Sequence, residues 1–174
     1  MHKTVFILFF LIMPALTLPG LAASNTLYLT GRVAHVGHQP FIKTVLHTAE
    51  PKTYLIAGAM YPELKNLRGA TVKVAGTIIG TDPFYNLTIL DVREYQVLTV
   101  DKGVKPWIGT LTVNHDLYLI TDQGRKIALD GPLVADSIKQ KGAKIWVTGT
   151  FRLKGLFKRV LRIDAFGIIR PSQS

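Results

Sequence analysis

Five cationic and two aromatic side chains are gathered in one short stretch of the chain, residues 151–162. Cationic side chains follow a phosphate backbone and aromatic rings offer stacking faces, so this combination is typical of surfaces that bind polyanions. The residues that we expect to take part are Arg152, Lys154, Phe157, Lys158, Arg159 and Arg162. The same composition also suits a solvated hairpin whose charges protect a sheet edge, and both interpretations stay open.

Three histidines lie close together in the first half of the sequence. His35 and His38 are three residues apart, and His47 follows on the next expected strand. Imidazole nitrogens bind zinc, copper and nickel, so strand pairing that brought His35 near His47 would create part of a metal site. The pattern offers no further ligands, and His115 in the second half is isolated, so we predict no metal site.

The sequence shows no combination of residues that is typical of catalysis. Cysteine is absent, which excludes a thiolate nucleophile and thiolate metal ligands. None of the serines, at positions 24, 137, 172 and 174, lies in a Gly-x-Ser-x-Gly setting, and there is no phosphate-binding loop of the Gly-x-x-x-x-Gly-Lys type. We therefore predict a non-enzymatic protein with no catalytic residues and no cofactor.

The first 23 residues have the pattern of a secretory signal peptide. A short start containing Lys3 precedes the apolar run Val5–Met13, and small residues, Gly20–Ala23, end the segment. The apolar run is shorter than the roughly 20 residues that a membrane-spanning helix needs. We expect cleavage after Ala22 or Ala23, no transmembrane span in the mature protein, and a periplasmic or secreted location. An uncleaved membrane anchor is the alternative.

The positive charge is concentrated in the second half of the mature chain. The formal net charge is +10, and residues 104–174 contain 12 Lys and Arg against 5 Asp, whereas residues 24–103 contain 8 Lys and Arg against 6 acidic residues. A basic field of this kind raises the local concentration of anions and is screened by salt. The partners that we expect are an anionic polymer, a lipid head group or an envelope protein, and nucleic acid is not expected for an exported protein.

Two stretches of the mature chain share the same spacing of glycines. In both stretches the glycines are separated by 11 and then by 7 residues, and the two sets are offset by 73 residues. The glycines are Gly58, Gly69 and Gly76 in the first stretch, and Gly131, Gly142 and Gly149 in the second. At the same offset Thr77 aligns with Thr150, and Asp91 with Asp164. Self-similarity of this extent predicts a duplicated structural unit.

Each unit is expected to contain five strands and one short helical turn, because β-branched and aromatic residues alternate with polar ones in short runs. In the first unit the strands are expected at 27–36, 42–48, 53–57, 71–78 and 86–97, with the helical turn at 61–67. In the second unit they are expected at 107–113, 116–121, 126–130, 144–153 and 159–169, with the turn at 134–139.

This order of elements, β-β-β-α-β-β in about 70 residues, resembles the oligonucleotide/oligosaccharide-binding fold, or OB-fold. The resemblance covers the mature chain and implies an all-β protein with short helical turns, made of two tandem five-stranded OB-like β-barrels. The chain is also similar to exported bacterial OB-fold proteins of unknown function. In OB-folds the loop between the fourth and fifth strands often borders the ligand groove, which implies that the cationic stretch borders a binding surface.

The expected organisation is a signal peptide over 1–23, a first barrel over 24–99, a linker over 100–104 and a second barrel over 105–174. Because the linker is short, we expect a fixed pair of barrels. Two functions follow as hypotheses. The first is an exported binding protein of the cell envelope that contacts an anionic ligand through the second barrel. The alternative is a structural or protein-interaction module of an envelope complex.

Overall fold

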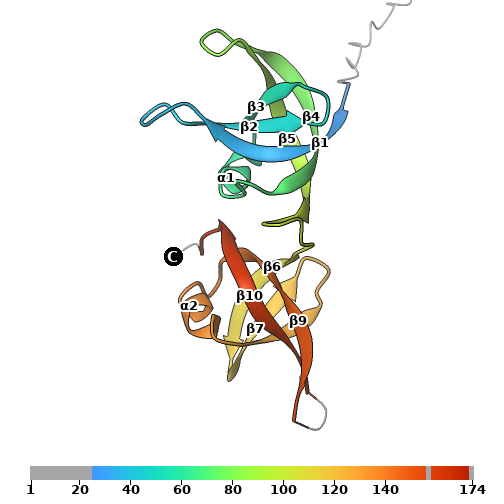
Figure 1. Ribbon diagram of the computed structural model, residues 1–174, viewed down its shortest axis with the longest axis vertical. Helices are drawn as coiled ribbons and strands as arrows, with labels where there is room; N and C mark the ends of the chain where they lie inside the picture. Colours follow the sequence, from blue (N-terminus) through green and yellow to red (C-terminus); the bar gives the residue numbers. More distant parts are fainter. Residues whose placement is uncertain (1–24, 156–157, 173–174) are drawn as a thin grey trace, which may run out of the picture.

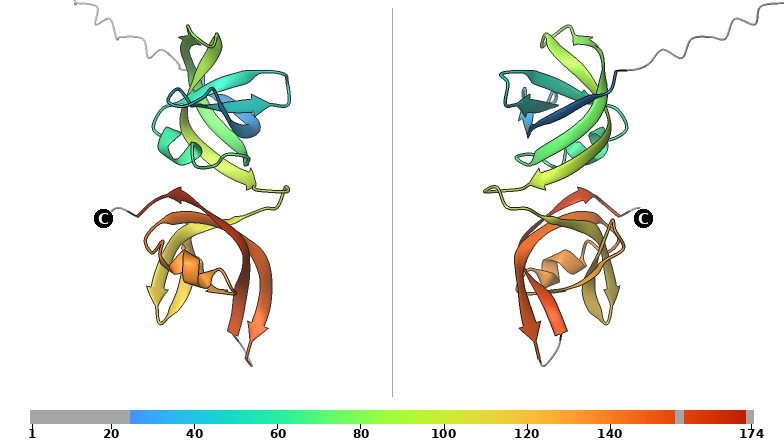
Figure 2. Two further views of the ribbon diagram at one scale, coloured as in Figure 1. Left: turned by 60° about the vertical axis from the view of Figure 1, so that its left-hand side comes forward. Right: turned by 90° about the vertical axis from the view of Figure 1, so that its right-hand side faces the viewer.

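The structure is a computed structural model that describes residues 25–155 and 158–172. The expected signal peptide, 1–23, and Phe157 lie outside the described residues. The described residues form ten strands and two short helices, which confirms the mostly-β class expected from the sequence. The strands make two bodies stacked along the long axis of the molecule (Figures 1 and 2). No helix among the described residues is long and apolar enough to cross a membrane.

The first five strands close into a barrel, which we call barrel 1. Its elements are β1 (Leu27–Val36), β2 (Lys43–Thr48), β3 (Thr53–Ala57), α1 (Tyr61–Leu64), β4 (Thr71–Asp82) and β5 (Leu87–Thr99). The strands pair in the order β1-β2-β3-β5-β4, and β4 pairs back with β1. All of these pairs are antiparallel except β3 with β5, which is parallel.

The last five strands follow the same order, and we call them barrel 2. The elements are β6 (Trp107–Asn114), β7 (Asp116–Thr121), β8 (Lys126–Asp130), α2 (Val134–Ile138), β9 (Lys144–Lys154) and β10 (Lys158–Arg170). The strands pair in the order β6-β7-β8-β10-β9, and β9 pairs back with β6. Each barrel carries its short helix between its third and fourth strands, as the sequence predicts.

The β4–β5 hairpin and the helical turn of barrel 1 differ from their expected lengths. The β4–β5 hairpin is longer than expected, because pairing continues outward until Asp82 lies opposite Leu87. The helical turn expected over 61–67 ends at Leu64, and its last i to i−4 bond runs from the amide of Lys65 to the carbonyl oxygen of Tyr61. Beyond it, the amides of Asn66 and Leu67 bond to carbonyls three residues back, so the segment ends as a tight turn.

Two equivalent glycines lie in the fourth strand of each barrel, against the backbone of the fifth. A Cβ atom at Gly76 would collide with the backbone carbonyl oxygen of Asp91, and one at Gly149 with that of Arg162. Both glycines lie beside an irregularity in the pairing of those strands. Because only glycine fits such a contact, the spacing seen in the sequence has the same structural cause in both barrels.

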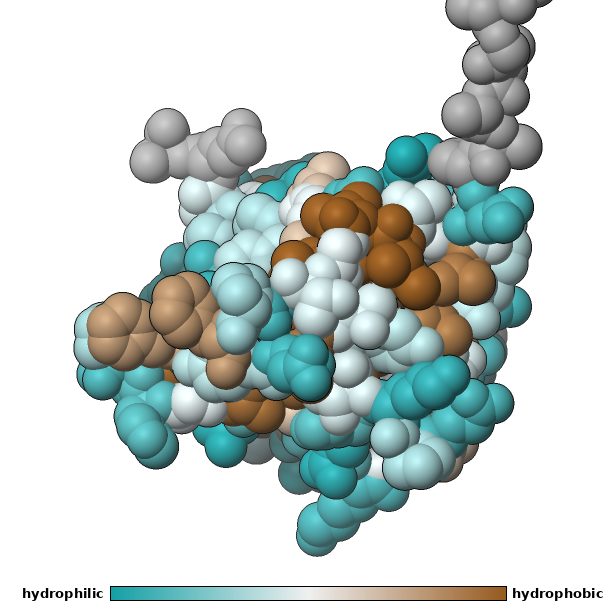
Figure 3. All heavy atoms as spheres, turned by 90° about the horizontal axis from the view of Figure 1, so that it is seen from above, coloured by the Kyte–Doolittle hydropathy of each residue, from teal (hydrophilic) through white to brown (hydrophobic). Residues whose placement is uncertain are grey.

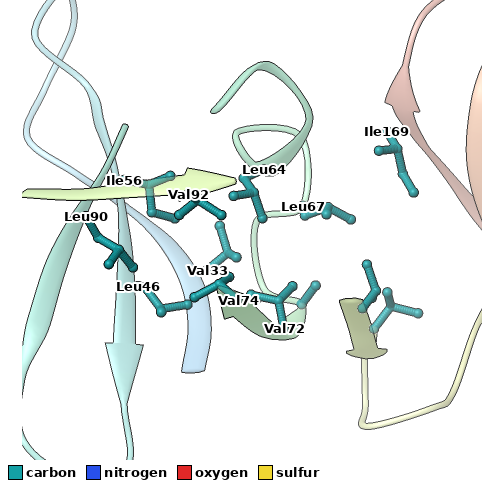
Figure 4. Close-up of a cluster of buried hydrophobic side chains, with 13 residues drawn as sticks. Val33, Leu46, Ile56, Leu64, Leu67, Val72, Val74, Leu90, Val92 and Ile169 are labelled. Atoms are coloured by element: carbon teal, nitrogen blue, oxygen red, sulfur yellow. The ribbon is translucent and has the colours of Figure 1, made fainter. Parts of the chain in front are cut away.

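Each barrel encloses a core of aliphatic side chains. The core of barrel 1 includes Val33, Leu46, Leu64, Val72 and Leu90 (Figure 4). The core of barrel 2 includes Leu111, Leu119, Ile145, Leu161 and Ile163. Leu64 comes from α1 and is fully buried, so this helix closes one end of barrel 1.

A residue of barrel 2 completes the core of barrel 1. Ile169, near the end of β10, is 0% exposed and belongs to the same buried cluster as Leu67 (Figure 4). Ile108 and Trp146 of barrel 2 pack against this cluster as well. The side-chain amide of Asn66 donates a hydrogen bond to the backbone carbonyl oxygen of Ile169, over 3.0 Å. The two barrels are therefore packed against each other, with α1 beside the end of β10 (Figure 1).

A buried carboxylate also links the barrels. Glu63 of α1 is 7% exposed, and its carboxylate oxygens lie 3.2 Å from Lys144 Nζ and 3.3 Å from Arg170 Nη1, both in barrel 2. The hydroxyl of Tyr95 donates a hydrogen bond to the same carboxylate. Burial raises the pKa of the Glu63 carboxyl, but the hydrogen bonds from Tyr95 and Lys144 and the two positive charges outweigh burial, so the pKa lies below its ordinary value. Burial, together with the neighbouring Glu63 carboxylate, raises the pKa of Tyr95.

Candidate functional site

The cationic stretch forms the hairpin between β9 and β10, which projects from barrel 2 at the bottom of Figure 1. Lys154 lies opposite Lys158, and Leu153 lies opposite Arg159. Directly opposed residues of an antiparallel pair share a face, and successive residues alternate between faces. The hairpin therefore separates the expected site residues. One face carries Arg152, Lys154, Lys158 and Arg162, and the other carries Phe151, Leu153 and Arg159.

Both lysines of the hairpin have acidic partners on other strands of barrel 2, that of Lys154 on β8 and that of Lys158 on β7. Lys154 Nζ lies 2.9 Å from Asp130 Oδ1, and Lys158 pairs with Asp116, whose carboxylate also accepts a hydrogen bond from Tyr118. The hydrogen bond from each lysine holds the pKa of its carboxyl partner below the ordinary value, and Asp116 raises the pKa of Lys158. The positive charge of these two lysines is thus already balanced by the protein itself.

On the opposite face of the hairpin, two aromatic rings lie side by side and each has an arginine over it. The guanidinium carbon of Arg159 lies 4.2 Å from the ring centre of Phe151. The rings of Phe151 and Trp107 meet edge to face, with centres 5.6 Å apart, and the guanidinium carbon of Arg125 lies 5.3 Å from the Trp107 ring centre. We call Arg125, Trp107, Phe151 and Arg159 the arginine–aromatic row. Its members come from the β7–β8 turn, β6, β9 and β10.

Local structure holds each member of the arginine–aromatic row in place. Trp107 lies opposite Val147 of β9, and both rings of the row pack against the core of barrel 2. The turn that carries Arg125 is closed by two hydrogen bonds with Thr121, one to its hydroxyl over 3.1 Å and one between backbones over 2.9 Å. The core of barrel 2 therefore holds the two rings in place, while both arginines are exposed to solvent.

The two arginines of the row keep their charge available. In the described part of the chain, no carboxylate lies within 4.0 Å of the guanidinium nitrogens of Arg125 or Arg159. A guanidinium that lies over an aromatic ring can still direct N–H groups toward another acceptor. The row can therefore offer bidentate hydrogen bonds to phosphate, sulfate or carboxylate groups without first breaking an ion pair.

Arg152 and Arg162 are the remaining described residues that the sequence predicts for the site, and they differ in exposure. Arg152 is exposed and has no carboxylate within ion-pair distance among the described residues, whereas Arg162 is half-buried and lies opposite Asp130 in the β8–β10 pairing. The sequence reasoning did not identify Trp107 and Arg125 as site residues. A signal was present in the aligned copies, because barrel 1 has Leu29 where barrel 2 has Trp107.

The histidines do not come together as the metal-site hypothesis required. His35 lies opposite Thr44 and His47 opposite Arg32, three positions apart along the β1–β2 pairing, so strand pairing does not place His35 opposite His47. Instead, a ring nitrogen of His35 bonds to the carbonyl oxygen of Lys65 over 3.0 Å, and His47 bonds to a threonine hydroxyl. Among the residues that the structure describes, no three metal-binding side chains are grouped.

Comparison with known proteins adds no relative from which a function could be transferred. No protein-family model matches the sequence, and no curated protein matches it.

Proposed function

We propose that the protein is an exported, non-enzymatic binding protein of the cell envelope, and that it contacts an anionic ligand through the arginine–aromatic row of barrel 2. The observation that carries this proposal is the contrast between the two faces of the hairpin. Lys154 and Lys158 are neutralised by acidic partners, whereas Arg125 and Arg159 stack on rings and have no acidic partner among the described residues.

The proposal includes two OB-like barrels that arose by duplication. The shared strand order, the helix between the third and fourth strands of each barrel, and the equivalent close contacts at Gly76 and Gly149 support it. The signal-peptide pattern of residues 1–23 supports export to the periplasm or beyond. In that location an anionic envelope polymer or a lipid head group is a better partner than nucleic acid.

The test measures binding to immobilised heparin, a polyanion probe, over a series of salt concentrations. The double variant R125Q/R159Q should lose at least about tenfold in affinity, because it removes two guanidinium groups that donate charge-assisted hydrogen bonds. The double variant K154Q/K158Q should lose less, because those charges are already paired.

The matched control is K52Q/K141Q, which lowers the net charge by the same amount at exposed positions away from the row. If the control loses as much affinity as R125Q/R159Q, net charge alone explains binding and the proposed site is wrong. If R125Q/R159Q binds like the unchanged protein, the row takes no part.

An exposed apolar cluster on barrel 1 favours the alternative function, a protein-interaction module of an envelope complex. Phe41 is 70% exposed and Phe84 is 91% exposed, and they lie on neighbouring hairpins that Tyr85 joins through a hydrogen bond to the carbonyl oxygen of Phe41. Figure 3, which looks down on barrel 1, shows hydrophobic side chains at its surface. Absence of salt-sensitive binding to heparin would favour this second function over the first.

A further inference from the structure

A cationic hollow lies on barrel 1, in the half of the molecule where the sequence predicts no anion site. Its volume is about 520 Å³, and it is open to solvent. The hollow lies where β4 begins and β5 ends, and it is bordered by the turn after α1 and by residues 101–103. Its lining residues are Arg32, Arg68, Gly69, Thr71, Thr99, Asp101, Lys102 and Gly103.

The floor of the hollow is a cross-strand set of three polar residues. Arg32 of β1 lies opposite Thr71 of β4, and Thr71 lies opposite Thr99 of β5. Their chain neighbours Val33 and Val72 are buried in the core. A register shift between Thr71 and Val72 skips one residue of β5, so Thr99 is the neighbour of the buried Val100, and the arginine and both threonines line the hollow. The result is one guanidinium group beside two hydroxyl groups.

The guanidinium of Arg32 is oriented by the protein but not neutralised. Its Nε donates a hydrogen bond to the carbonyl oxygen of Gly69 over 3.3 Å, which leaves the two terminal nitrogens for another acceptor. Throughout residues 25–155 and 158–172, no carboxylate lies within 4.0 Å of a side-chain nitrogen of Arg32, Arg68 or Lys102. Asp101 is the one acid that lines the hollow, so three cations face one carboxylate.

The linker side of the hollow is held in a defined conformation. Val100 is 2% exposed and belongs to the core of barrel 1. Its backbone pairs with that of Val104 through hydrogen bonds of 2.9 and 3.0 Å, and the amide of Gly103 bonds back to Val100. Lys102 is therefore carried on a closed turn, not on a free tether, so little ordering is required when a ligand binds.

We propose that this hollow binds a phosphate-bearing dianion, either a phosphomonoester or a pyrophosphate group. A guanidinium pair and an ammonium group supply more donors than a single carboxylate can accept, whereas a terminal phosphate has three acceptor oxygens. The excess of two positive charges in the lining matches the charge of the dianion. The threonine hydroxyls add neutral donors next to Arg32. The site is separate from the arginine–aromatic row and does not depend on it.

The dianion could belong to a soluble compound or to a lipid head group, and two probes distinguish these sources. Isothermal titration with inorganic pyrophosphate tests the soluble source. Co-sedimentation with vesicles of phosphatidylcholine containing phosphatidic acid, compared with vesicles of phosphatidylcholine alone, tests the head group. Binding to pyrophosphate indicates a soluble ligand, and binding only to the vesicles that contain phosphatidic acid indicates a membrane surface.

Whichever of the two probes binds the unchanged protein, the variant R32Q/R68Q should bind it at least about tenfold more weakly, because each arginine supplies charge-assisted hydrogen bonds. The single variant K102Q, on the exposed linker turn, should weaken it as well and leaves the barrel strands unchanged, so misfolding of the double variant does not decide the outcome. The control K43Q/K73Q removes two charges from barrel 1 outside the hollow and should bind like the unchanged protein.

The inference is overturned if neither probe binds the unchanged protein, or if R32Q/R68Q and K102Q both bind normally. The row variant R125Q/R159Q should keep its affinity for pyrophosphate. The failure of this inference is therefore distinguishable from the failure of the proposed heparin-binding site.

Discussion

At the scale of single residues, Glu63 has the most demanding environment in the junction between the barrels. Its carboxylate is surrounded by Lys144, Arg170 and the Tyr95 hydroxyl, and its side chain is only 10% exposed. Removing one partner of a buried pair leaves the other charges without compensation. The Arg170 side chain is 57% exposed, so water offsets part of that loss.

We predict that Glu63→Gln lowers the free energy of unfolding at neutral pH by about 2 kcal/mol, less than the loss of a partner from a fully buried ion pair. The control is Glu94→Gln, on the exposed surface of β5, which should change stability by less than about 0.5 kcal/mol. Urea unfolding of both variants measures the difference. Equal losses in the two variants would show that Glu63 has no special role at the junction.

The pH dependence of stability gives a second test at Glu63. The unfolded chain protonates this carboxyl near its ordinary pKa of about 4.3, whereas the folded protein keeps it ionised to lower pH. The stabilisation is therefore complete above that value and is lost as the pH falls through the lower pKa of the folded state. Unfolding curves recorded from pH 7 down to pH 3 should show the gap between Glu63→Gln and the unchanged protein narrowing with acidity. A constant gap would contradict this.

At the scale of elements, the sequence predicts the strands well and the site only in part. The ends of β1, β3, β7 and β8 agree with the expected ranges, because alternating burial and flanking glycines are local signals. The arginine–aromatic row has no local signal, since Trp107 and Arg159 are far apart in the chain and meet only when the barrel closes. The acidic partners of Lys154 and Lys158 could not be predicted either, because they come from β8 and β7 and are distant in the sequence.

Because Gly149 of β9 lies against the backbone of β10, adding a methyl group at this position should destabilise the protein. Gly149→Ala should destabilise barrel 2 by about 1–3 kcal/mol, because the new Cβ collides with the carbonyl oxygen of Arg162 and forces the strands apart. The neighbouring exposed variant Thr150→Ala is the control and should be close to neutral. Thermal unfolding followed by circular dichroism compares them, and an unchanged melting temperature in Gly149→Ala would refute the steric explanation.

At the scale of the whole molecule, the placement of Ile169 was not predictable from the sequence. Its strand is part of barrel 2, but its neighbour Ile168 packs against the core of that barrel, whereas Ile169 does not. That it enters the core cluster of barrel 1 depends on how the two barrels pack, which no local pattern encodes. The same holds for Lys144 and Arg170, whose partner Glu63 lies in the other barrel.

This packing predicts cooperative unfolding of the two barrels. Both tryptophans belong to barrel 2, so tryptophan fluorescence reports on that barrel and, through Trp146, on its contact with barrel 1, whereas circular dichroism reports on the whole chain. The two signals should change together in the unchanged protein. Ile169→Ala should lower stability by about 2–5 kcal/mol and separate the two signals.

The control is Ile163→Ala, in the core of barrel 2 itself, which should lower stability without separating the signals. Coincident transitions in Ile169→Ala would mean that other contacts couple the barrels.

The contribution of Ile169 to barrel 1 also has a consequence for the order in which the chain acquires its structure. The amino-terminal half is made first, yet it lacks part of its apolar interior until residue 169 arrives. The interior of barrel 1 therefore stays incomplete until the chain has been made as far as residue 169. Trimming the chain just before that isoleucine would therefore harm the half of the protein that lies furthest from the cut in sequence.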